Sequence, residues 1–387
     1  MAQILSQKLE ELRITFQQVA QRDIAPHAAK VDQESLYPHH SFEALAEAGL
    51  LGLHVPQRLG GLEQGLTALA LGTEAIAKYC SSSAMSYAMH CVGTAVIAAK
   101  PTRYQEEHYL RPIAEGKHIT TISLSESGTG AHFYLPSTKL IREGDNFVVC
   151  GTKQFVTNGG HADSYVVSTV ASTNSAEQGE FSCVLVDKNA DGLEWLAPWR
   201  GLGMRGNSSR GVKFNDVKVP AANLLGEEGD QVWYAFEVVA PYFLMAMSGT
   251  YLGIAQGALD YTLHHLRTRM HEHSGETLAQ IPVIQHRVTE LWTAIEKTRL
   301  LIYNAARMGD MGDAQALVSI LTAKADVADT AVWVVNEAMT LCGGIAYREN
   351  DDLARMLRDA RASHVMAPTT DMLKTWAGRA LLGLPLF

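Results

Sequence analysis

Apolar residues recur at helical spacing through the first part of the chain. Leu9, Leu12, Phe16 and Val19 lie three or four positions apart, which places them on one face of a helix. Similar spacing continues to about Lys117, interrupted by glycines that end one stretch before the next begins. The pattern predicts an all-helical region that includes helices over residues 66–80, 84–99 and 102–111.

The pattern changes between Ile119 and Leu225. Short runs of β-branched and aromatic residues alternate there with Gly, Asn and Asp, which favour turns. Such runs predict an antiparallel β domain placed between helical regions. Four of them cover residues 147–149, 165–167, 183–186 and 212–214.

Helical periodicity returns after Gly229. The aliphatic spacing suits antiparallel helices packed as a bundle, and because such bundles often continue across a subunit interface, we expect a homo-oligomer. The predicted helices cover residues 232–266, 283–308, 314–341, 351–360 and 369–382. The chain is therefore predicted to have an α+β multidomain fold, with a helical domain over 1–118, a β domain over 119–228 and a helical bundle over 229–387.

The composition fits several globular domains. The 387 residues are 47% apolar, and the formal net charge is −9. The sequence contains no run of basic residues that could neutralise the phosphates of a nucleic acid. The N-terminus lacks a basic segment followed by an apolar stretch, and no apolar run reaches the ~18 residues of a membrane span. Five cysteines stand singly without a C-x-x-C pair, so no disulfide framework and no metal site is predicted. We expect a cytoplasmic protein with no nucleic-acid partner and no membrane span.

The first segment with candidate chemistry is a glycine-rich turn. Residues 124–132 read LSESGTGAH and lead into the β domain. Glycine has no Cβ, so a backbone of this kind can approach a ligand closely. Taken alone, the segment is a weak indication of a ligand site, because most glycine-rich turns are ordinary turns.

The second segment ends a predicted strand. Residues 151–160 read GTKQFVTNGG, in which Phe155 and Thr157 are two positions apart and therefore on the same face of the strand. A planar ring stacked on Phe155 would bring its edge within hydrogen-bonding reach of Thr157. The alternative is a β-hairpin whose phenylalanine is partly buried and whose threonine merely favours a strand. The position of the segment after the first one favours the ligand site.

The third segment completes a recognisable order. Residues 201–210 read GLGMRGNSSR and are followed by FNDVKVP at 214–220. Together the segments resemble the acyl-CoA dehydrogenase family, whose pattern runs L-[ST]-E-P-x-x-G-S-D, G-x-K-x-[WFY]-I-T-N-G, L-G-x-R-x-S-x-T and F-x-D-V-x-V-P. The resemblance extends through Gln285, CGG at 342–344 and LRDAR at 357–361, and so covers nearly the whole chain.

The resemblance implies a fold, a cofactor and a substrate class. The fold is an N-terminal helical domain, a middle antiparallel β-barrel and a C-terminal four-helix bundle. FAD would lie between the barrel and the bundle and reach a neighbouring subunit of a tetramer or dimer. The substrate would be an acyl-CoA or an acyl-carrier thioester, and an electron-transfer flavoprotein is a possible partner.

The family's ligand positions can be carried over one by one. Ser125 corresponds to a contact at the flavin pyrimidine edge, Phe155 to the aromatic against the isoalloxazine, and Thr157 to the hydroxyl near its reactive nitrogen. The glycines Gly343 and Gly344 would let the backbone approach the pyrophosphate. The set implied for the cofactor is Leu124, Ser125, Gly130, Phe155, Thr157, Arg269, His271, Gln285, Thr340, Gly343, Gly344, Thr369 and Asp371. The set implied for the substrate is Ala131, His132, Arg205, Ser208, Met89, His90, Tyr242 and Ala367.

Several of these cofactor positions carry a residue other than the one usual in the family. Ala131 and His132 replace a Ser-Asp pair, and Thr340 replaces a glutamine. His271 stands where an arginine is expected, although Arg269 could substitute for it. Each lost hydrogen bond is worth ~1 kcal/mol, so we expect FAD to bind more weakly than is usual in the family.

The resemblance also places Ala367 where the family keeps its catalytic glutamate. That carboxylate removes the α-proton of the thioester, and alanine cannot accept a proton. Phe243 falls at the position of an alternative glutamate used by some members. Candidate replacements are His364, Asp371 and Tyr242. Each has a structural alternative, respectively a capped or surface histidine, a first-turn helix residue and a packed tyrosine.

Three functions remain open from the sequence. The first is α,β-dehydrogenation of an acyl thioester with a relocated base. The second is a reaction of the same fold that needs no such base, such as enoyl thioester reduction, flavin monooxygenation or elimination. The third is a catalytically inactive scaffold, for which little bound flavin is expected.

Overall fold

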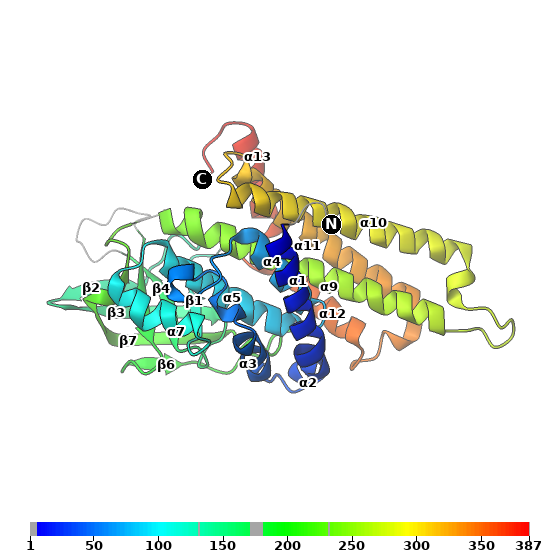
Figure 1. Ribbon diagram of the computed structural model, residues 1–387, viewed down its shortest axis with the longest axis horizontal. Coiled ribbons are helices and arrows are strands. Elements are labelled where there is room, and N and C mark those ends of the chain that lie inside the picture. Colours follow the sequence, from blue (N-terminus) through cyan, green and yellow to red (C-terminus); the bar gives the residue numbers. More distant parts are fainter. Residues whose placement is uncertain (1–5, 131, 171–180, 231–232, 387) are drawn as a thin grey trace.

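The protein has a β domain at one end and a bundle of long helices at the other, with the N-terminal helices between them (Figure 1). The computed structural model describes residues 6–130, 132–170, 181–230 and 233–386. Its element order is helical, then β, then helical, which confirms the predicted fold class. The N-terminal helices are α1 (Gln7–Val19), α2 (Ala28–Gln33), α3 (His39–Glu47), α4 (Leu66–Ala77), α5 (Ser81–Ala99), α6 (Arg103–Gln105) and α7 (Arg111–Ala114).

The long C-terminal helices form where the apolar spacing predicted them. α12 continues past the predicted end at residue 360, since no glycine or proline interrupts the chain before Pro368. The helix expected over 102–111 is instead divided by a π-helical turn at Glu106–Leu110, because Pro112 has no N–H to donate to the carbonyl one turn earlier. The helices are α9 (Ala240–Thr268), α10 (Pro282–Asp310), α11 (Ala316–Cys342), α12 (Asp352–Val365) and α13 (Thr370–Leu381).

Glycines let α9 pack directly on α4. Gly249, Gly253 and Gly257 are four residues apart and so lie on one face of α9. A Cβ at Gly249 would stand 2.2 Å from Thr73 Oγ1, and one at Gly253 would stand 2.3 Å from the Glu74 carbonyl oxygen. This close approach joins the N-terminal helices to the bundle and fixes the start of α9, which contributes to the cavity described below.

The β domain consists of two four-stranded sheets. One has the order β1 (Thr120–Ser123), β4 (Ser164–Thr169), β5 (Ser182–Asp187), β8 (Leu224–Leu225), and the other has the order β2 (Lys139–Glu143), β3 (Asn146–Val156), β7 (Arg210–Pro220), β6 (Leu193–Trp195). Strands β1 and β4 run parallel, whereas the sequence predicted a wholly antiparallel domain. The parallel pair is possible because the connection between these strands is long and includes two strands of the other sheet.

The first sheet is covered on both faces. Tyr165 and Val167 of β4 pack toward the second sheet, whereas Val166 packs toward the helices. This double coverage explains why β4 is buried along its whole length and why its sequence is almost continuously apolar. The sheet therefore holds the glycine-rich turn that follows β1 against the helical part of the molecule.

One helical segment, Tyr234–Thr268, is long and apolar enough by composition to cross a membrane. Of its most apolar window, 83% is buried inside the protein. A central helix that packs on α4, α10, α11 and α12 requires this apolar surface on nearly every side.

Candidate active site

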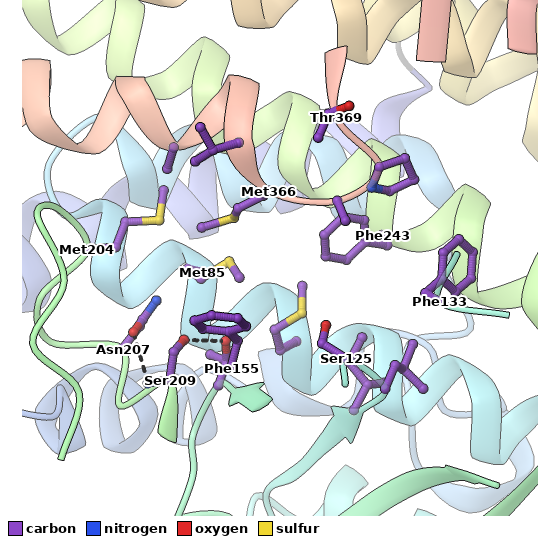
Figure 2. A pocket seen from close by; sticks show the side chains of 18 of the residues that line it. Met85, Ser125, Phe133, Phe155, Met204, Asn207, Ser209, Phe243, Met366 and Thr369 are labelled. Atoms are coloured by element: carbon purple, nitrogen blue, oxygen red, sulfur yellow. Dashed lines mark hydrogen bonds between the residues drawn. The ribbon is translucent and has the colours of Figure 1, made fainter. Parts of the chain in front are cut away.

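A cavity of about 750 Å³ opens where the helical N-terminal region, the β domain and the bundle meet. Met366 and Thr369 lie across it from Phe155 and Ser125 (Figure 2). Apolar side chains line most of its wall. The lining residues are Met85, Met89, Ile122, Leu124, Ser125, Glu126, Ser127, Gly130, Phe133, Phe155, Thr157, Trp199, Leu202, Gly203, Met204, Asn207, Ser209, Val239, Ala240, Phe243, Arg358, Arg361, Ala362, Val365, Met366, Ala367, Pro368 and Thr369.

Phe155 presents an uncovered aromatic ring to this cavity. The residue is 64% exposed, and its ring meets that of Trp199 edge-on with the centroids 6.2 Å apart. Its φ of +55° is rare for a residue with a Cβ, and it occurs where the pairing of β3 with β7 is irregular. Backbone strain of this kind persists where it positions a functional side chain. The exposed face of the ring is open to a planar ligand.

Two hydroxyl groups lie beside the ring. Thr157 Oγ1 and Ser209 Oγ are 3.0 Å apart, and both residues are buried. One hydroxyl donates to the other, so one O–H of the pair is left for a ligand. Ser125 contributes a third hydroxyl to the lining, and its own carbonyl accepts from the N–H of Gln154 at 2.7 Å.

Among the described residues that line the cavity, Glu126 is the one with a carboxylate. Its Oε1 lies 2.7 Å from Lys153 Nζ, and its carboxylate also accepts from Ser137 and Thr138. Burial alone would raise the pKa of Glu126, but the charge and hydrogen bond of Lys153, with the two hydroxyls, hold that pKa well below its ordinary range. Glu126 is therefore a permanently ionised structural residue, to which the sequence analysis assigned no role.

The predicted replacement bases all lie outside the cavity lining. On α12, helical spacing turns Ala362 and Val365 toward the cavity and turns His364 away, so that its Nδ1 lies 3.1 Å from Thr370 Oγ1. Asp371 is exposed in the first turn of α13. Tyr242 packs edge-on against a histidine on the other side of α9, and burial raises its pKa to about 12.

The positions implied for the family's base do line the cavity. Ala367 follows the end of α12 on one wall, and Phe243 on α9 is close by. Neither side chain can accept a proton. Of the described residues around the cavity, none therefore offers a free carboxylate.

Of the other residues predicted to bind the substrate, one on α5 lines the cavity and its neighbour lies in the protein core. Met89 lines the cavity, whereas the next residue of α5, His90, takes no part in the lining and is fully buried. The Nε2 of His90 lies 3.0 Å from the carbonyl oxygen of Leu51, its Nδ1 accepts from the N–H of Thr120, and burial lowers its pKa to about 4. It is a core histidine.

Three other substrate candidates do not face the cavity. Arg205 Nε lies 3.9 Å from Asp32 Oδ1, and Ser208 donates to the Gly159 carbonyl at 2.9 Å. The ring nitrogen Nδ1 of His132 is 2.8 Å from the hydroxyl of Tyr134. The remaining candidate, Ala131, lies outside the described residues.

Cofactor positions also fall into two groups. Leu124, Ser125, Gly130, Phe155, Thr157 and Thr369 come together in the cavity. The others sit on the helical bundle and take no part in the lining: Arg269, His271, Gln285, Thr340, Gly343, Gly344 and Asp371.

The distal group is accessible from outside the chain. Arg269 and Gln285 lie at the end of α9 and the start of α10, at the tip of the bundle away from the β domain (Figure 1). Gly343 has a φ of +68°, and no heavy atom of the described residues lies within 4 Å of a Cβ built on it or on Gly344. Such open backbone is accessible to a ligand held by another molecule.

Several lining residues had no role in the sequence analysis, although some stood inside its third segment. Met204, Asn207 and Ser209 belong to GLGMRGNSSR, and Trp199 precedes it directly. The polar and bulky side chains in this glycine-rich segment could have indicated that it lines a ligand site. Nothing in the sequence indicated that Arg361 and Met366 line the cavity, because the sequence does not show which face of their helix meets the β domain.

A buried lysine holds the segment that carries Ala367. Lys324 of α11 is fully buried and donates to the carbonyl oxygens of Ser363, at 2.7 Å, and Pro368, at 3.2 Å. These two bonds bracket the residues that form one wall of the cavity. Burial lowers the pKa of Lys324 from 10.5 to about 8.

We expect this lysine to make stability rise with pH. Between pH 8 and 10.5 the unfolded chain keeps a proton that folded Lys324 has lost, so the free energy of unfolding increases across this window by about 3 kcal/mol. The variant Lys324→Met should lack this increment, as measured by thermal unfolding of both proteins from pH 8 to 10.5. Parallel curves for the two proteins would contradict it, since every other titrating group is common to both.

Three family models match the chain in order. The N-terminal domain of acyl-CoA dehydrogenase matches residues 6–117, the middle domain matches 121–217, and the C-terminal domain matches 244–382. The models thus cover parts of all three regions that line the cavity, although Val239, Ala240 and Phe243 fall between the second and third matches.

Individual relatives agree over the whole chain. Cyclohex-1-ene-1-carbonyl-CoA dehydrogenase of Geobacter metallireducens is 32% identical over 96% of this chain and 98% of its own length. Butyryl-CoA dehydrogenase of Megasphaera elsdenii superposes with a TM-score of 0.91 at 25% identity, covering 98% of this chain and 99% of that one. A chain in the structure of the electron transferring flavoprotein of Acidaminococcus fermentans superposes with a TM-score of 0.92 at 25% identity, covering 98% of both chains. The protein therefore belongs to the acyl-CoA dehydrogenase family.

Proposed function

We propose that this protein binds FAD in the cavity and oxidises an acyl thioester between its α and β carbons, using a proton acceptor other than the usual glutamate. The observation that carries the proposal is the exposed ring of Phe155, with the Thr157 hydroxyl beside it and Ser125 in the same lining. A flat ligand with polar edges satisfies all three groups at once. Family membership supports the same reading, because the family is FAD-dependent.

The described residues fit an isoalloxazine ring. Phe155 gives a stacking surface, and the Thr157 and Ser209 pair gives a donor. The buried Nδ2 of Asn207 has no partner among the described residues. Without a ligand, the aromatic ring of Phe155 is exposed to water and the buried amide of Asn207 lacks a hydrogen bond, and both situations cost free energy. Binding a heteroaromatic ring removes both costs.

The reaction assigns distinct tasks to the two walls. When bound, FAD supplies the acceptor for the hydride that leaves the β carbon. Met85, Met89 and Phe243 form an apolar surface that receives the acyl group and excludes water. The backbone around Ala367, held by Lys324, fixes the opposite wall.

The α-proton then needs an acceptor. Of the three candidates, we place it on His364, because its partner Thr370 directly follows Thr369 of the lining. Burial lowers the pKa of His364, which keeps its imidazole neutral and able to accept a proton. His364 also directly precedes Val365 on α12, which lines the cavity.

The absence of a free carboxylate among the described lining residues also favours a second candidate. Enoyl thioester reduction, flavin monooxygenation and elimination use the same fold without an α-proton base. In this reading, the cavity binds the same cofactor and a related thioester but does not remove the α-proton.

Assembly and partners follow from the same proposal. Large apolar side chains of the bundle are exposed on α10 and α11, including Val283, Trp292, Leu300 and Trp333. We propose that they form a subunit interface of a cytoplasmic dimer or tetramer, which would bring the open Gly343 backbone to a neighbour's cofactor. An electron-transfer flavoprotein is the proposed electron acceptor, and the carrier of the thioester is CoA or an acyl carrier protein.

The test is the visible absorption spectrum of the purified protein before and after anaerobic addition of acyl-CoAs. The set should contain short, branched, long and cyclic acyl groups, since the Geobacter relative is named for a cyclic one. Bleaching of a flavin band would support dehydrogenation. A band that persists with every thioester would favour the second candidate, and a protein that binds no FAD even when it is supplied would contradict both.

A further inference from the structure

The amide of Asn207 is buried in the cavity wall and only half used. The residue is 1% exposed, and its Oδ1 accepts from the backbone N–H of Ser209 at 3.1 Å. Among the residues that the structure describes, its Nδ2 has no hydrogen-bond partner. Figure 2 shows the side-chain nitrogen directed toward the cavity, beside Ser209 and below Met204.

The orientation of this amide is fixed by the chain. If oxygen and nitrogen were exchanged, the NH₂ group would face the N–H of Ser209, and two donors would meet. The oxygen must therefore point to the backbone, and the nitrogen must point into the cavity. A buried donor in this position is satisfied only by a ligand or by water.

The main chain around Asn207 is held on several sides. Its N–H donates to the Met204 carbonyl at 3.2 Å, and its own carbonyl accepts from the N–H of Asn158 at 3.0 Å. The preceding residue, Gly206, donates to Ser82 Oγ at 3.1 Å. The following residue, Ser208, has a φ of +50°, a conformation that persists only when the surroundings impose it. The amide is therefore preorganised.

The neighbouring donors define the chemistry of the ligand atom. The spare O–H of the Thr157 and Ser209 pair and the Nδ2 of Asn207 lie on the same wall. All three side chains are uncharged. They suit a neutral acceptor, such as a carbonyl oxygen or an unprotonated ring nitrogen, in preference to a phosphate.

We propose that Asn207 is a ligand-binding residue whose Nδ2 donates a hydrogen bond to a neutral acceptor atom of the molecule held in the cavity. The inference rests on the proposed function for the two molecules that could provide this acceptor. One is the flavin, through a carbonyl oxygen or a ring nitrogen, and the other is an acyl thioester, through its carbonyl oxygen. In the family pattern this position is serine, whose shorter side chain does not present an NH₂ group. The longer amide is a feature of this chain.

Two variants separate binding from folding. Asn207→Leu removes the donor and the acceptor. Asn207→Ser removes the NH₂ group but keeps a hydroxyl oxygen able to accept from the N–H two residues on, and it adds no charge. Each variant is compared with the unchanged protein by the Kd of FAD, the Kd of an acyl-CoA for the FAD-loaded protein, and the thermal unfolding of the apoprotein.

About a tenfold weaker Kd for FAD in both variants would identify the flavin as the acceptor, since one hydrogen bond is worth about this factor. An unchanged Kd for FAD with about a tenfold weaker Kd for acyl-CoA would identify the thioester. Both results support the proposal. Unchanged affinity for both molecules in both variants would overturn it.

The apoprotein gives an independent readout. Because Nδ2 has no partner in the described part of the chain, Asn207→Ser should leave the melting temperature of the apoprotein unchanged or slightly higher. A fall of several degrees would show that the amide serves the fold, which overturns the proposal. This comparison needs neither ligand, so it can still overturn the role proposed for Asn207 if the protein binds no FAD and the proposed function fails.

Discussion

Replacing Ala367 with glutamate is expected to raise the rate at which an acyl-CoA bleaches the bound flavin by about 10²–10⁴-fold, the contribution of a well-placed general base. Ala367 lines the cavity on the segment after α12, in the stretch between Met366 and Thr369. In the proposed reaction, removal of the α-proton lacks a carboxylate, because Glu126 is already bound to Lys153. A new carboxylate at 367 would supply the acceptor in the substrate compartment. The measurement is the anaerobic half-reaction in a stopped-flow spectrometer.

Two controls make this result specific. Ala367→Gln has nearly the same volume as the glutamate variant but accepts no proton, so it should be no faster than the unchanged protein. Ala362→Glu places a carboxylate elsewhere on the same wall and should also fail to accelerate bleaching. If Ala367→Glu is no faster than these controls, removal of the α-proton does not limit the reaction, and the second proposed function becomes the stronger one.

The local parts of this site could be predicted because each is continuous in the sequence. Phe155 and Thr157 are two residues apart on one strand, and both line the cavity with Ser125. The helical candidates could not be resolved in the same way. Phe243 and Tyr242 are adjacent on a helix that is apolar on almost every side, so its periodicity does not indicate which face meets the cavity.

The contacts between residues far apart in the chain could not be predicted from the sequence for a different reason. Lys324 approaches Ser363 and Pro368 only because α11, α12 and the segment after α12 pack together. In the sequence, this lysine is one polar residue on a largely apolar helix and would be expected to face solvent. Burial and partners of this kind follow from the tertiary arrangement, which no periodicity in a single element encodes.

Lys153→Met is expected to lower the free energy of unfolding by about 3–5 kcal/mol, because it leaves the Glu126 carboxylate buried without its partner. Lys153 is fully buried and also donates to the Leu124 carbonyl and to Ser168 Oγ. These bonds join the glycine-rich turn to two strands. The matched control is Lys213→Met on β7, whose partner Glu194 is exposed, and it should change stability little. Chemical unfolding of the three proteins compares them directly.

The pH dependence of the Lys153→Met protein gives the sharper test. In the unchanged protein, the pKa of Glu126 is held below its ordinary 4.5, so its contribution to stability is present above pH 4.5 and is lost as the pH falls further. Without Lys153, burial, which is the largest single influence on the pKa of Glu126, is opposed by the hydroxyls of Ser137 and Thr138 and no longer by a charge. We expect that pKa to rise above 4.5, so that on acidification the folded variant gains a proton that the unfolded chain does not bind. The variant should therefore become more stable on mild acidification from neutral pH. Adding Glu126→Gln should recover part of the lost stability at neutral pH and abolish this gain, because the double variant has no charge to neutralise. If the two variants share one pH profile, the ion pair is not the source of the loss.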